Sequence, residues 1–527
     1  MSERVSNRRQ EVQLLPECID DYVEATNPVR ALDAYVDSLD LPTLGFLVKE
    51  AGTRGRKQTY EPEAMLKLLI YGYLNQVRSS RKLERETKRN LEVIWLMERA
   101  RPDHWTINEF RRRHRKSFQK VLRDFHRICD FLELFGREIE AIDGSFFKAL
   151  NNKSKNFTKA KLERLEAKID AAIEKYLDDL DQEDSAGTEA PAVNEPNEPN
   201  EPNEPNEPNE PNEPVRNLVA KGSLEELQAK KRRVKELKQG CEESESGQVS
   251  LSDEDSRLLR KGGQSVVGHN VQSVVDGDHH LIAHVEIVQA GNDAGQLEPM
   301  ARAGCEALGI EWDGEVPEGG PVKVVADGGY SNSAQVAACE EAGLEVHLPL
   351  KKTTAIETAG YREEDFRHDA ESDEYECPQG KRLKRHADKK SKATVYRVYY
   401  NTAACRGCPC LERCTEGKFR KLAISEHREV EEKVRERMAG NPEVYGLRKQ
   451  IVEHPFGTLK SVWGYRQFMV RGKEGCEGEL NLMALCYNWT RVFNEVGFER
   501  LMEAIEAVLA TVFGDWRSRS LGLSAVD

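Results

Sequence analysis

Apolar residues recur at helical spacing through most of the first 135 residues of the chain. Pro62 suits the first turn of a helix, where its missing N–H has no partner to lose. Met65 and Leu69 then follow on one face of that helix. We therefore predict an all-α N-terminal domain over residues 1–135.

The pattern changes to strands at residue 138 and then alternates between strand and helix. We expect strands at 139–142, 264–276, 281–288, 321–326 and 344–350, and helices at 296–308 and 333–343. Gly277 and Asp278 separate two of these strands and suit a hairpin turn. This order predicts an α/β core, a mixed sheet flanked by helices, built from residues 136–152 and 246–360.

Residues 153–245 interrupt that core and predict an inserted helical arm. Helices are expected at 159–181 and 223–238, and each carries a single apolar stripe that it cannot bury alone. We expect them to pair antiparallel, like a short coiled coil. Seven consecutive Asn-Glu-Pro triplets, residues 194–214, join them. Proline at every third position removes amide donors and favours extended chain, so we expect this tract to be a disordered linker.

The rest of the chain divides by composition. Residues 361–425 hold a concentration of cysteines, and residues 426–500 return to helical spacing. A helix over 443–453 is expected to end at Pro455 and Gly457. We assign 426–500 to the C-terminal part of the core, and 501–527 to a terminal helix and tail.

Charge changes the interpretation of the first domain. The 527 residues carry 78 Lys and Arg against 92 Asp and Glu, a net charge of −14. Residues 54–127 nevertheless hold 20 Lys and Arg against 9 Asp and Glu, a local excess of 11. No apolar run reaches membrane-spanning length and no signal-peptide pattern opens the chain, which favours a cytoplasmic protein over a membrane or secreted one.

One predicted helix concentrates this positive charge. Thr106 is expected to cap it, with Glu109 three residues on as the acidic partner of a capping box. The helix then presents four arginines, Arg111, Arg112, Arg113 and Arg115. A solvated helical face is the simpler interpretation of such a run. A small helical domain that ends in a basic helix also fits DNA binding, to which we assign these arginines.

Three carboxylates stand out by position. Asp143 and Asp327 each follow a hydrophobic strand, and ligands of open α/β sheets bind at strand ends. Glu453 lies near the end of a predicted helix. Taken singly, an aspartate at a strand end is more often a turn former than a catalytic residue. Taken together, three carboxylates are hard oxygen ligands suited to two Mg²⁺ or Mn²⁺ ions.

Longer motifs surround these carboxylates. They are Phe110-Arg-Arg-Arg-His, Ala-Ile-Asp143-Gly, Val-Val-Gly-His-Asn-Val-Gln-Ser-Val-Val-Asp276, Ala-Asp327-Gly-Gly-Tyr-Ser-Asn332, Pro455-Phe456-Gly and Glu479-Leu-Asn-Leu-Met-Ala-Leu-Cys-Tyr-Asn488. With them the chain resembles the DDE transposases of bacterial insertion sequences over most of its length. Such transposases often carry Tyr-x2-Arg-x3-Glu-x6-Lys. Here Tyr445-x2-Arg448 and Glu453-x6-Lys460 are present, but four residues separate Arg448 from Glu453.

The resemblance implies an RNase H-like catalytic core and Mg²⁺-dependent cleavage and strand transfer of DNA. It makes Asp143, Asp327 and Glu453 the catalytic metal ligands, and the DNA ends of the element and the target DNA the partners. Arg448 and Lys460 would contact DNA phosphates. A homodimer is expected by analogy, because two ends must meet in one complex. Two alternatives stay open: a DNA-binding regulator with an inactive core, and a nuclease of the same fold that does not transpose.

The cysteines predict a second metal site. Cys377 precedes Cys405-x2-Cys408-x5-Cys414, and four thiolates in two groups suit tetrahedral Zn²⁺. Cys410 is a spare that could replace a neighbour. Reduced, unliganded cysteines are the simpler alternative, and an iron–sulfur cluster lacks supporting spacing. We expect a structural zinc.

Overall fold

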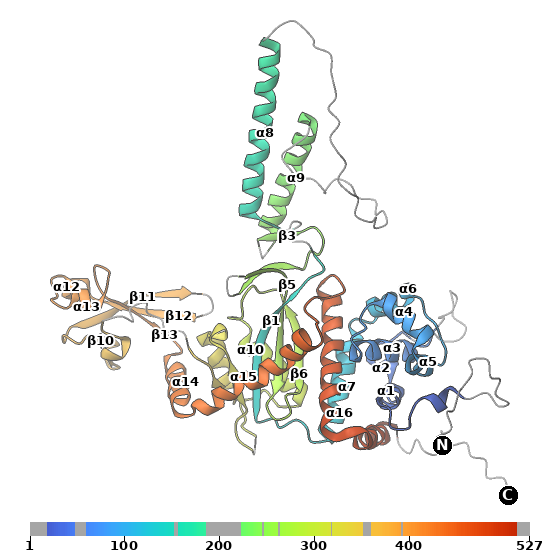
Figure 1. The fold of residues 1–527 in the computed structure, drawn as a ribbon. Coiled ribbons are helices and arrows are strands. Elements are labelled where there is room, and N and C mark those ends of the chain that lie inside the picture. The colour runs from blue at the N-terminus through green and yellow to red at the C-terminus, as the bar shows by residue number, and fades with distance from the viewer. Residues whose placement is uncertain are drawn as a thin grey trace, which may run out of the picture. The chain divides into compact units, whose positions relative to one another are not determined.

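The computed structural model describes residues 18–47, 60–151, 156–185, 223–244, 247–261, 264–317, 319–350, 360–391 and 394–513. The chain divides into two compact units, Met1–Leu150 with His269–Asp527, and Asn151–Gly268 (Figure 1). The Asn-Glu-Pro tract and the end of the predicted C-terminal tail lie outside the described residues. None of the described helices is long and apolar enough to cross a membrane.

The first unit begins with short helices, as the apolar spacing predicts. They are η1 (Ile19–Tyr22), α1 (Pro28–Asp37), α2 (Leu41–Leu44), α3 (Pro62–Leu74), α4 (Ser80–Arg89), α5 (Leu91–Leu96), α6 (His104–Arg113) and α7 (Ser117–Phe131). Helix α3 is buried on nearly every side, and α7 packs along α16 (Lys473–Phe513). Tyr35, Phe125 and Trp489 meet in one aromatic cluster, with ring centroids 5.5–5.6 Å apart, so the two ends of the chain share a core.

A mixed sheet forms the centre of this unit. Its strands are β1 (Ile139–Lys148), β5 (Gln264–Asp276), β6 (Ile282–Val288), β7 (Lys323–Ala326) and β8 (Glu345–His347). The order is β4-β5-β1-β7-β8, where β4 (Arg257–Lys261) belongs to the second unit, and β6 also pairs with β5. Strands β1, β7 and β8 are parallel, and β5 and β6 form the antiparallel hairpin predicted from the turn residues. The predicted α/β core is therefore confirmed.

Helices cover this sheet on both faces. Successive β1 residues point to opposite faces. Glu140 lies against α10 (Leu297–Leu308), where a Cβ on Gly304 would come within 2.8 Å of its carboxylate. Asp143 points the other way and meets α15 (Pro442–Gly457). Helices α11 (Ser333–Glu341) and α14 (Arg428–Gly440) pack beside β8.

Helix α15 differs from its predicted end. It continues through Pro455 to Gly457 and into the π-helical segment η5 (Thr458–Val462). Proline removes one intrahelical hydrogen bond. Here its ring is buried together with Ile451, Val452 and Phe456, and this packing keeps the helix running. Helix α16 contains its own break, at Gly497, whose φ is 77°.

The cysteine-rich segment forms a small antiparallel sheet. Its strands are β9 (Arg367–Asp369), β10 (Glu374–Glu376), β11 (Arg382–Ser391), β12 (Thr394–Tyr400) and β13 (Lys421–Ser425), in the order β13-β12-β11-β10-β9. Short helices α12 (Thr402–Cys405) and α13 (Leu411–Cys414) follow β12. The core of this sheet is built from Phe366, Tyr375, Leu383, Tyr399, Leu422 and Ile424.

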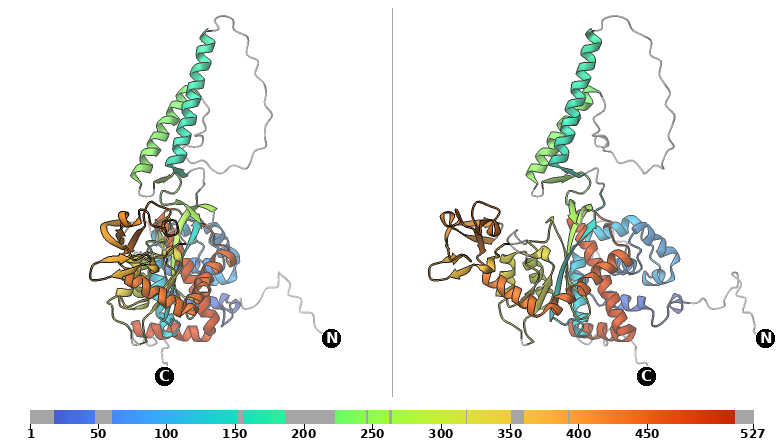
Figure 2. Two further views of the ribbon diagram at one scale, coloured as in Figure 1. Left: turned by 90° about the vertical axis from the view of Figure 1, so that its left-hand side faces the viewer. Right: turned by 60° about the vertical axis from the view of Figure 1, so that its left-hand side comes forward.

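The second unit contains the helical pair. Helices α8 (Lys159–Ser185) and α9 (Leu224–Glu243) run side by side in both views of Figure 2. The ion pairs Lys231–Asp170 and Lys238–Glu166 show that they are antiparallel, because one number rises as the other falls. Strands β2 (Asn156–Thr158) and β3 (Gln248–Ser250) pair at their base, and β4 (Arg257–Lys261) pairs with the first residues of β5. This unit is longer than the arm expected from the sequence.

Candidate active site

The sheet register brings Asp143 and Asp327 together. Strands β1 and β7 are parallel neighbours, and Ile142 lies opposite Ala326. Asp143 directly follows Ile142, and Asp327 directly follows Ala326. Neighbouring strands lie about 4.8 Å apart. Two carboxylates 184 positions apart in sequence therefore meet at one edge of the sheet.

Arg448 bridges these two aspartates. Its guanidinium lies 3.3 Å from Asp143 Oδ1 and 3.6 Å from Asp327 Oδ2. The exposed fractions of the three side chains are 16%, 18% and 32% in that order. Two carboxylates so close together repel each other, and a partly buried cation offsets that repulsion. Arg448, separated from Glu453 by four residues where the motif has three, thus contacts both aspartates.

The backbone of Gly329 lies close to the Asp327 carboxylate. Asp327 caps η3 (Gly328–Tyr330), and its Oδ1 accepts a hydrogen bond from Gly329 N–H at 2.7 Å. A Cβ on Gly329 would come within 2.6 Å of the same oxygen, so a larger residue would displace the carboxylate. Gly329 therefore fixes the aspartate without blocking it.

Asp293 is a fourth carboxylate at this edge, and sequence reasoning missed it. A Cβ on Gly144 would lie 2.8 Å from Asp293 Oδ1, and one on Gly329 would lie 3.6 Å from Asp293 Oδ2. The side chain thus lies between the residues that follow Asp143 and Asp327. It reaches this place because β6, like β7, ends at the level of the sheet where β1 carries Asp143.

Two amides on β5 hold Asp293. Its Oδ1 accepts hydrogen bonds from Asn270 Nδ2 at 3.1 Å and from Gln272 Nε2 at 2.8 Å. Both amide side chains are buried within an otherwise apolar strand. Polar residues two apart on a buried strand point to one face, and this was the sequence signal for a polar partner.

Tyr330 completes the network. Its hydroxyl donates to Gln272 Oε1, and its ring is fully buried. Burial raises the pKa of Tyr330 far above its ordinary value, and the negative charges of Asp293, Asp143 and Asp327 raise it further. All three carboxylates therefore act on the same hydroxyl, which stays protonated and serves as a donor.

Glu453 occupies a different position on α15. It lies five residues after Arg448, which corresponds to about 7.5 Å along the helix and about 140° around it. Its side chain is exposed, whereas Arg448 points to the sheet. The described contacts do not join Glu453 to the two aspartates.

Lys460 lies on η5, two turns beyond Glu453. Its Nζ donates to Ser145 Oγ at 2.6 Å and to the Phe146 carbonyl at 2.7 Å. Both acceptors follow Asp143 on β1, so Lys460 fastens the π-helical segment beside the aspartate pair. Single-turn π-helices occur often at functional sites.

The four N-terminal arginines assigned to DNA differ in exposure. Three of them lie on α6, and Arg115 lies two residues after its end. Arg111 is only 5% exposed, donates to the Arg78 carbonyl at 2.8 Å and lies over the Tyr73 ring. It is thus a packing residue, which differs from the expected DNA contact. Arg112 and Arg113 are exposed and pair with Glu109, and Arg115 pairs with Glu474.

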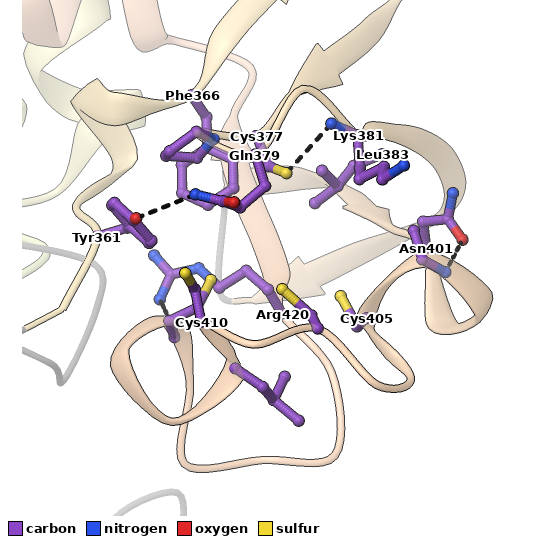
Figure 3. A pocket seen from close by; sticks show the side chains of 15 residues that line it. Tyr361, Phe366, Cys377, Gln379, Lys381, Leu383, Asn401, Cys405, Cys410 and Arg420 are labelled. Carbon is purple, nitrogen blue, oxygen red and sulfur yellow. Dashed lines mark hydrogen bonds between the residues drawn. The ribbon is translucent and has the colours of Figure 1, made fainter.

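The cysteines line one cavity in the small sheet. Cys377, Cys405, Cys408, Cys410 and Cys414 all border it, and Figure 3 shows three of them labelled around it. Burial raises the pKa of the Cys414 thiol, and Cys405, Cys377 and Cys408 raise it further, against an opposing effect of Arg420. Those neighbours are the other three expected zinc ligands.

Two details of this cavity resemble a metal knuckle. Lys381 N–H donates to Cys377 Sγ at 3.4 Å, and Gly407, between Cys405 and Cys408, has a φ of 77° that favours glycine. The thiols are free, and no three of them have sulfurs within 4.8 Å of one another in the described structure. A soft thiolate set in this arrangement fits Zn²⁺.

The carboxylate edge fits a hard divalent cation. Asp143 and Asp327 already hold one positive group, the guanidinium of Arg448, between them. Carboxylate oxygens are the donors that Mg²⁺ and Mn²⁺ prefer. The donor set is therefore suited to divalent metal, with Asp293 close enough to support it.

Two protein families match the chain. Residues 17–113 match a family described as Transposase domain (DUF772), and residues 376–493 match one described as Transposase DDE domain. The second match includes Arg448, Glu453 and Lys460. No curated protein and no solved structure matches the chain.

Proposed function

We propose that this chain, an insertion-sequence DDE transposase by its two family matches, cleaves the ends of its own element and joins them to target DNA. A transposase acts on DNA, so DNA is its partner. The observation that carries the proposal is the β1–β7 register, which aligns Asp143 with Asp327 under Arg448.

The strand order supports an RNase H-like core. An antiparallel hairpin, β6 and β5, precedes the parallel strands β1, β7 and β8 in the sheet. Asp143 lies within β1 and Asp327 directly follows β7, the central strands, as the proposal requires.

In this proposal Asp143, Asp327 and Glu453 hold the metal ions. Bound Mg²⁺ supplies positive charge that activates the attacking oxygen and stabilises the leaving one. Arg448 neutralises the aspartate pair and contacts a DNA phosphate. Lys460 keeps η5 against β1, which fixes the end of the helix that carries Glu453.

The reaction needs no covalent enzyme intermediate. Water attacks the phosphorus at the element end, a new P–O bond forms, and the P–O bond to the 3′-oxygen breaks. The freed 3′-hydroxyl then loses its proton and attacks a phosphorus of target DNA. The new P–O bond joins the strands, and the P–O bond to the 3′-oxygen of the target strand breaks and leaves a 3′-hydroxyl there. Arg112 and Arg113 are exposed, Arg115 is partly exposed, and all three are assigned to DNA phosphates. A homodimer that acts in the cytoplasm would hold the two ends.

The cysteine cavity is proposed to hold a structural zinc. Cys377, Cys405, Cys408 and Cys414 are proposed as the ligands, because they line one cavity and Gly407 makes the turn between Cys405 and Cys408. The small sheet has a core of only six buried side chains, so a metal would add stability that this core lacks.

A plasmid that carries the DNA flanking the gene tests the proposal. Purified protein with Mg²⁺ should cut at the element ends and yield joined products, and EDTA should abolish both. Cleavage without joining would identify a nuclease instead. Binding without cleavage would identify a regulator and overturn the proposal.

A further inference from the structure

The outer part of the β11–β12 ribbon carries a charged surface that the site above does not use. Residues 382–391 and 394–400 hold six Lys and Arg and one Asp. Beyond Lys384, strand β11 pairs only with β12 in the described sheet. We define the outer ribbon as residues 388–391 and 394–397.

On β11 the described side chains of the outer ribbon are exposed, whereas on β12 Thr394 is buried and Arg397 is exposed. All side chains from 384 to 390 are exposed, whereas Leu383 is buried. Lys389 and Lys390 are neighbours on one strand, so they point to opposite faces. A ribbon charged on both faces is unsuited to packing against protein. It suits a groove whose two walls are lined by anions.

The cations closer to the core are already paired. Arg382 lies 3.4 Å from Asp369 and Glu374, and Arg385 lies 2.9 Å from Asp388. In contrast, Lys389, Lys390 and Arg397 form no ion pair with any described residue. Asp388, the acid directly opposite Arg397 in the register, pairs with Arg385, and Glu426 uses its carboxylate to accept from Val395 N–H at 2.9 Å.

Contacts place the outer ribbon at the end of the small sheet that leads to the carboxylates. Glu426 N–H also donates to the Val395 carbonyl, and the chain then enters α14. On α14, Glu431 accepts a hydrogen bond from Ser333 Oγ. Ser333 lies six residues after Asp327 in the sequence. Burial raises the pKa of Tyr396, and the negative charge of Glu431 raises it further. The side chains of Glu431 and Tyr396 therefore lie near each other.

From this geometry we propose that Lys389, Lys390 and Arg397 bind the phosphates of duplex DNA beside the scissile position. A two-stranded ribbon fits the major groove, and duplex DNA carries one charge per about 1.7 Å of its axis. Single-stranded stacking fits less well, because His386 already covers the Tyr400 ring at 3.6 Å between centroids. The inference rests on the proposed function.

The test uses the full-length protein and a labelled random-sequence duplex. Substitutions K389Q, K390Q and R397Q are combined, and affinity is measured across salt concentrations. Three lost phosphate contacts should lower the slope of log affinity against log salt by about 2.7 and weaken binding at low salt by about tenfold or more. Thermal melting should match the wild type, because the side chains are exposed.

The matched control removes three exposed cations from the helical arm: K175Q, R232Q and K235Q. It should keep the wild-type slope. An unchanged slope in the ribbon variant, or an equal loss in the control, would overturn the inference, as would a loss seen only with single-stranded DNA. The variant Asp143→Asn separates the two proposals, because it should lose cleavage with Mg²⁺ yet bind the duplex with the wild-type slope.

Discussion

Glu140 is the second residue of β1, three residues before Asp143. Its carboxyl group is fully buried, and neither oxygen has a hydrogen-bond partner among the described residues. Burial raises its pKa from 4.5 to about 8, and the charge of Asp276 adds to the rise. The folded protein therefore keeps this group neutral near pH 7, while the unfolded chain ionises it.

This difference makes stability depend on pH. Below about 4.5 both states are protonated, and between about 4.5 and about 8 only the unfolded state loses the proton. The contribution of Glu140 to the free energy of unfolding should thus fall by about 1.4 kcal/mol per pH unit in that window. Urea unfolding of Glu140→Gln should lack this slope. The exposed Glu138→Gln is the control, and a Glu140→Gln slope equal to the wild type would contradict the assignment.

Asp293 shows why part of the site escaped sequence reasoning. Its loop carries no motif, and its role follows from a pairing across β5 that only the fold provides. Asp143, Asp327 and Arg448 were named from the chain alone because two follow hydrophobic strands and the third lies in a motif. Arg111, by contrast, was expected at the surface and is buried, because helix position does not reveal which arginine faces the core.

Asp293→Asn should lower the cleavage rate by about 10- to 100-fold, as loss of a supporting carboxylate does at metal sites. Affinity for duplex DNA should stay near the wild-type value. Glu311→Gln, an exposed acid of the same unit, is the matched control. Cleavage by Asp293→Asn at the wild-type rate would exclude the residue from the site.

At the scale of elements, the predicted helices and strands were largely confirmed, with both ends of β5 as predicted, but some helix ends were wrong. Asp103, not Thr106, caps α6, and it accepts from Thr106 N–H at 2.7 Å. Both residues are good caps, so local propensity could not choose between them. Pro455 likewise reads as a helix end, yet the packing of its ring holds it inside α15.

The small sheet should depend on metal. If four cysteines hold zinc, elemental analysis should find about one Zn per chain. Cys377→Ser should release it and lower the melting temperature, because the core of this sheet is small. Cys410→Ser lines the same cavity and should retain the metal. Equal zinc loss in the two variants would show that the ligand set is wrong, and metal-free wild-type protein with unaltered folding would remove zinc altogether.

For the whole molecule, the active site collects segments from across the chain. Asp143, Asp293, Asp327 and Arg448 come from four separate stretches, and two insertions fall between them. Sheet register and strand ends position these residues, so the insertions are free to carry other functions. The net charge of −14 does not oppose DNA binding, because the cations that would meet DNA gather on particular helices and strands.

The central claim is that three carboxylates carry out metal-dependent cleavage of DNA. The most direct measurement is the Mg²⁺-dependent cleavage rate at the element ends for Asp143→Asn, Asp327→Asn and Glu453→Gln, with the exposed Asp313→Asn as control. Each of the three should lose several kcal/mol of transition-state stabilisation, about a thousandfold or more in rate, while binding of the ends stays measurable. The control should cleave like the wild type. Near wild-type cleavage by any of the three variants would contradict the account for that residue, and by Asp143→Asn or Asp327→Asn would contradict the site itself.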